Sequence, residues 1–76
     1  MEEVGVFIHT TNGIMVLGRN IYIGSATIAI DISVLNALTM TRLYELGATM
    51  SHRSDHWRVQ ISKKYIKDTE FFDILD

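Results

Sequence analysis

The sequence contains no cysteine and no proline, and each absence excludes a class of protein. Without cysteine, no disulfide can staple the fold and no thiolate is available for nucleophilic or metal chemistry. Because small secreted domains usually depend on disulfides, we expect a cytoplasmic, intracellular protein. The lack of proline and the presence of only five glycines argue against a long disordered linker.

Long apolar runs and an excess of positive charge are also missing. No stretch approaches the roughly 20 apolar residues that a membrane-spanning helix needs, so we expect no membrane partner. Glu2 and Glu3 carry the wrong charge for the start of a secretory signal. Seven basic and nine acidic residues give a net charge of −2, which argues against a protein whose main task is to bind nucleic acid.

What the chain does contain is enough apolar side chain for one core. Its 76 residues, 47% of them hydrophobic, predict a single domain over residues 1–76. A domain of this size buries only about 60–65% of its unfolded surface, so its stability is marginal. Because disulfides are excluded, self-association is one remaining source of stability.

The N-terminal part of the chain predicts a β-hairpin. Residues 4–9 are rich in β-branched and aromatic side chains, which favour a strand. Asn12-Gly13 follows, and this pair is the strongest short signal for a hairpin, typically with a type I′ turn. Residues 14–17 then form the returning strand.

A third strand is predicted over residues 21–23. Gly18 marks either a turn before this strand or a bulge within one longer strand. Residues 27–30 either continue the third strand past a bend or form a short strand of their own. Together these segments predict a three-stranded antiparallel meander.

Residues 32–46 show the clearest helical periodicity. Apolar side chains recur on one broad stripe, with Asp31 or Ser33 as the N-cap and Gly47 in the left-handed position after the helix. The stripe consists of Leu35, Leu38, Leu43 and Leu46, flanked by Val34 and Met40.

The second half of the chain predicts a loop, a strand and a short helix. Residues 48–55 are polar and typical of a loop, whereas residues 56–62 alternate between inward and outward positions. Asp68 is the expected N-cap of a short C-terminal helix. On this helix, Phe71 or Phe72 would form one apolar face together with Leu75. The inward set is Trp57, Val59 and Ile61, and the outward set is His56, Arg58, Gln60 and Ser62. The predicted fold class is α+β with the order β-β-β-α-β-α.

Chemistry-bearing residues are sparse. His52, Asp55 and His56 form the one cluster that resembles a metal or acid/base site, but His52 and His56 fall in a predicted loop and at a strand start. Solvated polar histidines are the simpler interpretation. Neither a nucleophile elbow nor a phosphate-cradling glycine loop is present in the sequence. We therefore predict no enzyme, no metal and no cofactor.

Two surfaces remain as candidate binding sites. Basic side chains follow the predicted strand at 56–62 and could contact nucleic acid, or could protect an edge strand from aggregation. Apolar side chains on the outer side of the meander form an interface for a protein, unless the predicted C-terminal helix covers them. The basic set is Arg53, His56, Arg58, Lys63 and Lys64, and the apolar set is Phe7, Met15, Leu17 and Tyr22, with Phe71 and Phe72 from the predicted helix.

No motif in the sequence identifies a family. The small, cysteine-free layout without a catalytic motif is like that of many accessory or inhibitor proteins encoded by phages and mobile elements. Our leading hypothesis is a protein-binding module that occludes or bridges a protein partner, or that self-associates as a homodimer. The alternative is a small nucleic-acid-binding domain that uses the basic face of the strand at 56–62.

Overall fold

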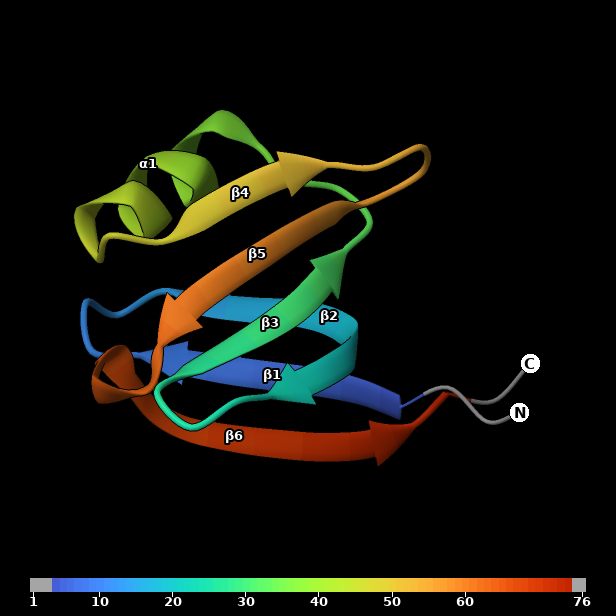
Figure 1. The fold of residues 1–76 in the computed structure, drawn as a ribbon, viewed down its shortest axis with the longest axis horizontal. Helices are drawn as coiled ribbons and strands as arrows, with labels where there is room; N and C mark the ends of the chain where they lie inside the picture. The colour runs from blue at the N-terminus through green and yellow to red at the C-terminus, as the bar shows by residue number, and fades with distance from the viewer. Residues whose placement is uncertain (1–3, 75–76) are drawn as a thin grey trace.

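A computed structural model describes residues 4–74, which form a curved six-stranded antiparallel sheet and one α-helix (Figure 1). The strand order is β4-β5-β3-β2-β1-β6, and every neighbouring pair is antiparallel. The α+β class and the N-terminal meander are confirmed. The elements are β1 (Val4–Thr10), β2 (Met15–Ile23), β3 (Thr27–Ile32), α1 (Ala37–Glu45), β4 (Thr49–His52), β5 (Trp57–Ser62), a 3₁₀ turn (Lys63–Tyr65) and β6 (Ile66–Asp73).

The β1–β2 hairpin forms where Asn12-Gly13 predicts it, but with a different turn. Only Gly13 adopts a positive φ, of 85°, so the predicted type I′ geometry, which needs two such residues, is wrong. The turn is instead held against the helix. The Asn12 amide donates to the Arg42 carbonyl over 2.9 Å, and the Arg42 guanidinium donates back to the Asn12 carbonyl.

The predicted third strand at 21–23 is the second half of β2. A register shift between Arg19 and Tyr22 marks a bulge, and Asn20 adopts φ 55° within it. The alternative of a bulge in one longer strand is therefore correct, although the bulge follows Gly18 by two residues. Residues 27–30 belong to a separate strand, β3. The bulge bends β2 and increases its twist. The first half of β2 therefore pairs with β1, and its second half pairs with β3.

The helix is shorter than its periodicity predicts. It begins at Ala37 rather than 32, and its N-cap is Asn36, whose side chain accepts from the Thr39 N–H over 2.8 Å. The start predicted from Asp31 is wrong, because Asp31 and Ile32 continue β3. Leu43 and Leu46 are buried as expected, whereas Leu38 in the first turn and Val34 before it are exposed. Gly47 follows with φ 74°, which confirms the predicted left-handed position.

Two strands occupy segments for which the sequence predicts other structure. Residues 49–52, predicted as loop, form β4 beside β5. The predicted C-terminal helix is wrong, since residues 66–73 form β6 and pair with β1 from Val4 to Thr10. A helix of that length needs packing to persist, whereas a strand here satisfies its backbone against β1. Leu75, which completed the predicted helix face, lies outside the described residues.

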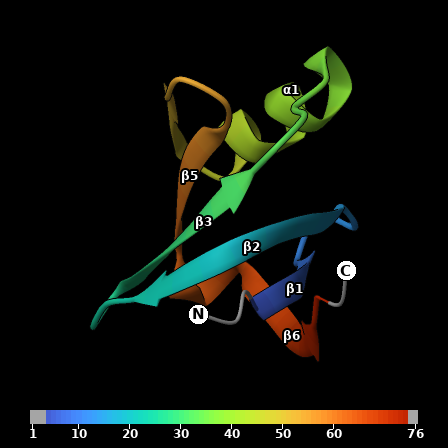
Figure 2. The same ribbon diagram turned by 90° about the vertical axis from the view of Figure 1, so that its right-hand side faces the viewer.

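The core lies on the concave side of the sheet, with α1 closing one end (Figure 2). Alternation places Val6 and Ile8 of β1 and Val59 and Ile61 of β5 in this core, with Trp57 partly buried at its border. The buried apolar residues are Val6, Ile8, Val16, Ile28, Ile30, Ile32, Leu43, Leu46, Ala48, Val59 and Ile61. The helix among the described residues is neither long nor apolar enough to cross a membrane.

Candidate functional site

The convex side of the sheet, here called the outer face, carries an exposed apolar cluster. The register aligns Phe7 with Leu17 across β1 and β2, and sets Met15 opposite His9. Met15 is 58% exposed and Leu17 is 54% exposed. The predicted placement of Phe7, Met15 and Leu17 on the side away from the core is confirmed, and their role in an interface stays a prediction.

Phe72 joins this cluster because Gly5 lets its ring cross β1. Phe72 pairs with Gly5, and a Cβ built on Gly5 would lie 2.3 Å from Phe72 Cε2. The ring therefore occupies the space that a side chain at position 5 would need, and its centroid lies 5.5 Å from that of Phe7. We call Phe7, Met15, Leu17 and Phe72 the apolar patch.

Phe71 does not belong to the apolar patch. It pairs with Val6, whose side chain is buried in the core, so Phe71 points to the concave side of the sheet. It is nonetheless 55% exposed, because β6 is the edge strand. The helix predicted for this segment placed Phe71 and Phe72 together, but the alternation of a strand separates them.

A groove of about 450 Å³ adjoins the apolar patch, between β2 and the chain that leaves β3. Its lining is mainly apolar, and Arg19 and Ser33 supply polar groups that are joined by a 3.0 Å hydrogen bond from Arg19 Nη2 to Ser33 Oγ. The lining residues are Met15, Val16, Leu17, Gly18, Arg19, Ile32, Ser33, Val34, Thr39, Phe72 and Ile74.

The other half of the outer face is polar and centres on Asp31. This carboxylate is 5% exposed although it lies on the convex side, because neighbouring side chains cover it. Arg58 holds both oxygens, with Nε 2.8 Å from Oδ1 and Nη2 3.2 Å from Oδ2. The guanidinium also lies 4.5 Å from the ring centroid of Tyr22 and donates to its hydroxyl. The hydrogen bond to Asp31 is the main cause that raises the pKa of Arg58.

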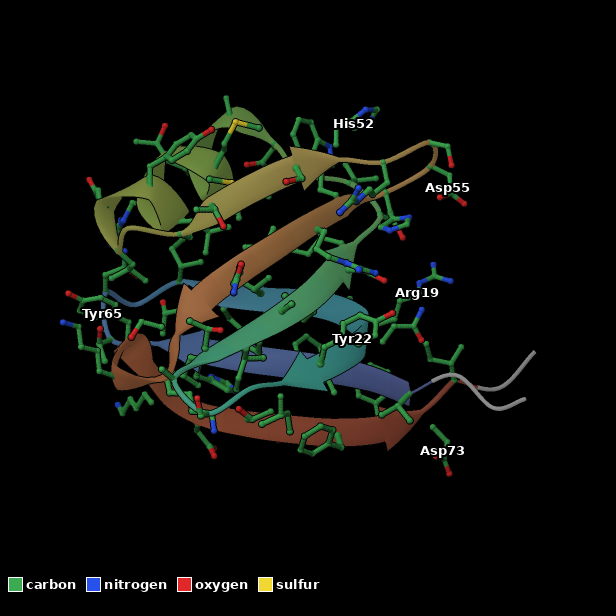
Figure 3. All side chains as sticks on the ribbon, viewed as in Figure 1. Arg19, Tyr22, His52, Asp55, Tyr65 and Asp73 are labelled. Carbon is green, nitrogen blue, oxygen red and sulfur yellow. The ribbon has the colours of Figure 1, made fainter. Side chains whose placement is uncertain are left out.

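His56 lies between two carboxylates next to this ion pair. Its Nδ1 is 2.7 Å from Asp55 Oδ1, and its Nε2 is 3.6 Å from Asp31 Oδ1. Within the described residues, the buried Nε2 atom has no hydrogen-bond partner. Figure 3 shows Arg19 and Tyr22, which flank the bulge in β2, and Asp55 in the turn between β4 and β5. A second hollow, of about 230 Å³, is lined by Arg19, Asn20, Asp31, Ser33, Asp55 and His56.

The hydrogen bond from His56 lowers the pKa of Asp55 below its ordinary value of 3.8. A lowered carboxylate pKa stabilises the folded state above the ordinary pKa, and this contribution is lost as the pH falls through the folded value. We therefore expect Asp55→Asn to lower the unfolding midpoint slightly at pH 6. The difference from the wild-type chain should shrink as the pH falls below 3.8 and through the lower pKa that Asp55 has in the folded state, as measured by thermal melts at pH 6 and in strong acid. An equal deficit at both would contradict this assignment.

The predicted basic set does not gather into one surface. Arg53 and His56 lie in the turn between β4 and β5, whereas Lys63 and Lys64 lie in the 3₁₀ turn after the end of β5. Arg58 stands between them, but its charge is neutralised by Asp31. The nucleic-acid hypothesis stays a prediction, and the net charge of −2 continues to oppose it.

His52 and His56 do not meet. His52 pairs with Trp57, and the two rings lie 4.7 Å apart at the concave side, whereas His56 reaches Asp31 on the convex side. Residues 4–74 contain no group of three or more histidine, cysteine, aspartate or glutamate side chains arranged to hold a metal ion. The alternation around the β4–β5 turn therefore separates the imidazoles whose spacing suggested a site.

Sequence reasoning misses Asp31, Arg19 and Ser33 as site residues. Helical periodicity makes Asp31 a helix cap, yet it is a lone acid in the apolar run from 27 to 32, on the face opposite Ile30 and Ile32. A charge at that position in a central strand is itself a signal that a partner lies nearby. The partner, Arg58, is 27 residues away and could not be identified from spacing.

Comparison of the chain with protein-family models, with curated proteins and with solved structures finds no match.

Proposed function

We propose that this protein is a protein-binding module that occludes or bridges a protein partner through the apolar patch. The observation that carries this proposal is the position of β6. The predicted C-terminal helix would have covered the patch, but β6 lies in the plane of the sheet beside β1. No element among residues 4–74 covers Met15 and Leu17, and contiguous exposed apolar surface marks an interaction site.

The surroundings of the patch suit a protein interface. Interfaces commonly combine an apolar centre with a polar rim. Here His9 Nε2 lies 2.7 Å from Glu70 Oε2 on the β1–β6 side, and Arg19, on the same face as Leu17, pairs with Asp31 of the Asp31–Arg58 pair on the β3 side. A second copy of the chain is one partner of this kind, so the homodimer hypothesis is part of the same proposal.

Site-specific photocrosslinking tests the proposal, because it captures a partner whose identity is unknown. We expect a photoreactive phenylalanine analogue at Leu17, in the cells that produce the protein, to crosslink one protein or a second copy reproducibly. The same analogue at Tyr44, which is equally exposed on α1, is the matched control. A complex identified in this way should be weakened at least about tenfold by Leu17→Asp, because a charge in an apolar interface is desolvated.

Two results would contradict this function. One is equal crosslinking at positions 17 and 44. The other is an identified complex whose affinity, measured by calorimetry with purified components, is unchanged by Leu17→Asp. Because Leu17 is 54% exposed, the substitution should leave the thermal midpoint of the free chain almost unchanged, which separates loss of binding from loss of folding.

A further inference from the structure

The first half of β2 has one unpaired edge. In an antiparallel pair, alternate residues direct their backbone groups toward the partner and away from it. The Thr10 N–H donates to the Ile14 carbonyl over 2.9 Å, which sets the phase of this alternation between β1 and β2. Val16 and Gly18 consequently bond to β1, and the N–H and C=O groups of Met15 and Leu17 point to the opposite edge.

No strand among the described residues pairs with that edge. The pairing between β2 and β3 ends at Arg19 and Asp31. Beyond this point β3 diverges from β2 and leads toward α1 (Figure 2). The groove of about 450 Å³ lies in this opening, with Met15 to Arg19 along one wall and Ile32 to Val34 along the other. The unpaired backbone groups therefore face a groove that is lined by apolar side chains.

We propose that this groove binds an extended peptide segment of the partner protein, which adds as a short strand to the edge of β2 at Met15 and Leu17. The inference rests on the proposed function and specifies how the partner is held. Hydrogen-bonding groups in a row at a sheet edge are complementary to an extended backbone, and hardly to a helix. The groove volume of about 450 Å³ lies within the range of about 300–1,000 Å³ that is typical of small-molecule pockets.

The lining also determines the chemistry of the peptide. Side chains of an added strand alternate between two sides, so every second residue of the peptide lies among Leu17, Val34 and Ile74 and should be apolar. Arg19 pairs with Asp31 at the point where the pairing between β2 and β3 ends, and its side chain lines that end of the groove. A carboxylate at the corresponding end of the peptide, from an acidic side chain or a free C-terminus, complements the guanidinium.

Selection from a displayed library of random decapeptides, with the complete chain as bait, tests this inference. We expect enriched peptides with alternating apolar residues and a carboxylate at one end. With a selected peptide bound, amide hydrogen exchange measured by NMR should slow at least about tenfold at Met15 and Leu17. The amides of Val16 and Gly18, already bonded to β1, should change little.

Substitutions in the groove test whether the selected peptide binds there. Val34→Asp, at a position that is 83% exposed, should weaken the selected peptide at least tenfold, and Tyr44→Asp should have no effect. Arg19→Gln should weaken a peptide with the carboxylate about five- to tenfold and leave its amide analogue unaffected. Comparison of an amidated C-terminus with an aspartate-to-asparagine change identifies the source of the carboxylate.

The failures of these experiments separate this inference from the proposed function. Peptides that bind over Phe7 and Phe72 without slowing exchange at Met15 and Leu17 would overturn strand addition and leave the apolar patch as the interface. If no peptide is enriched but a partner is crosslinked at position 17, strand addition is likewise overturned and the apolar patch remains the interface. Absence of both would overturn the inference and the proposed function together.

Discussion

Replacing Arg58 with methionine is expected to lower the midpoint of thermal unfolding by roughly 10–15 °C at neutral pH. Methionine keeps much of the apolar stem of arginine but removes both hydrogen bonds to Asp31. The Asp31 carboxylate would then remain almost buried without its main partner, and an uncompensated buried charge is strongly unfavourable. Circular dichroism melts of the two chains at the same concentration would measure the difference.

A double variant separates the ion pair from simple loss of packing. Because buried ion pairs can often be replaced by apolar residues without loss of stability, Asp31→Leu combined with Arg58→Met should recover much of the deficit. A double variant that is less stable than Arg58→Met alone would show that the pair has another role in the sheet. An unchanged midpoint for Arg58→Met would show that Asp31 does not depend on Arg58.

Gly18→Ala is also expected to be disruptive, with a loss of about 1–3 kcal/mol and a fall in the thermal midpoint of about 5–15 °C. A Cβ at position 18 would lie 2.5 Å from Ile30 Cδ1 and 2.7 Å from the Asp31 carbonyl oxygen. The first contact can be relieved by a side-chain movement, but the second involves the backbone of β3. The clash therefore pushes apart the two strands at the place where β2 and β3 begin to pair.

Ile30→Ala provides the matched test for this explanation. Alanine lacks both Cγ1 and Cδ1, each of which lies 2.5 Å from the built Cβ, so the cost of Gly18→Ala should be smaller in the Ile30→Ala background than in the wild-type chain. Denaturant unfolding of the four chains gives the coupling between the two positions. Additive effects would show that the contact with Ile30 does not cause the loss.

The two variants act on the same junction of the fold. Arg19 and Asp31 are the last paired residues before β3 leaves β2, and this is where the groove begins and where the polar half of the outer face meets the apolar half. Loss of stability at this junction should therefore also alter peptide binding in the groove. The photocrosslinking and exchange experiments are best made with Leu17 and Val34, which are exposed and contribute little to stability.

Local features of this protein can be predicted from the order of its amino acids alone. Alternation over residues 56–62 predicts which side chains of β5 enter the core, and Asn12-Gly13 predicts the hairpin. The same period of two places Phe7, Met15 and Leu17 on the side away from the core. These features depend on neighbours in the chain, so periodicity and turn chemistry are sufficient to predict them.

Features that depend on distant partners emerge only when the chain is folded. Residues 66–73 have side chains that suit a short helix, but they form a strand because β1, at the other end of the chain, offers an edge. Asp31 is part of a buried ion pair because the order β5-β3-β2 brings Arg58 beside it. The groove exists because β3 leaves β2 after Asp31 to reach α1. In each case the free energy comes from contacts between segments far apart in sequence, which local pattern does not encode.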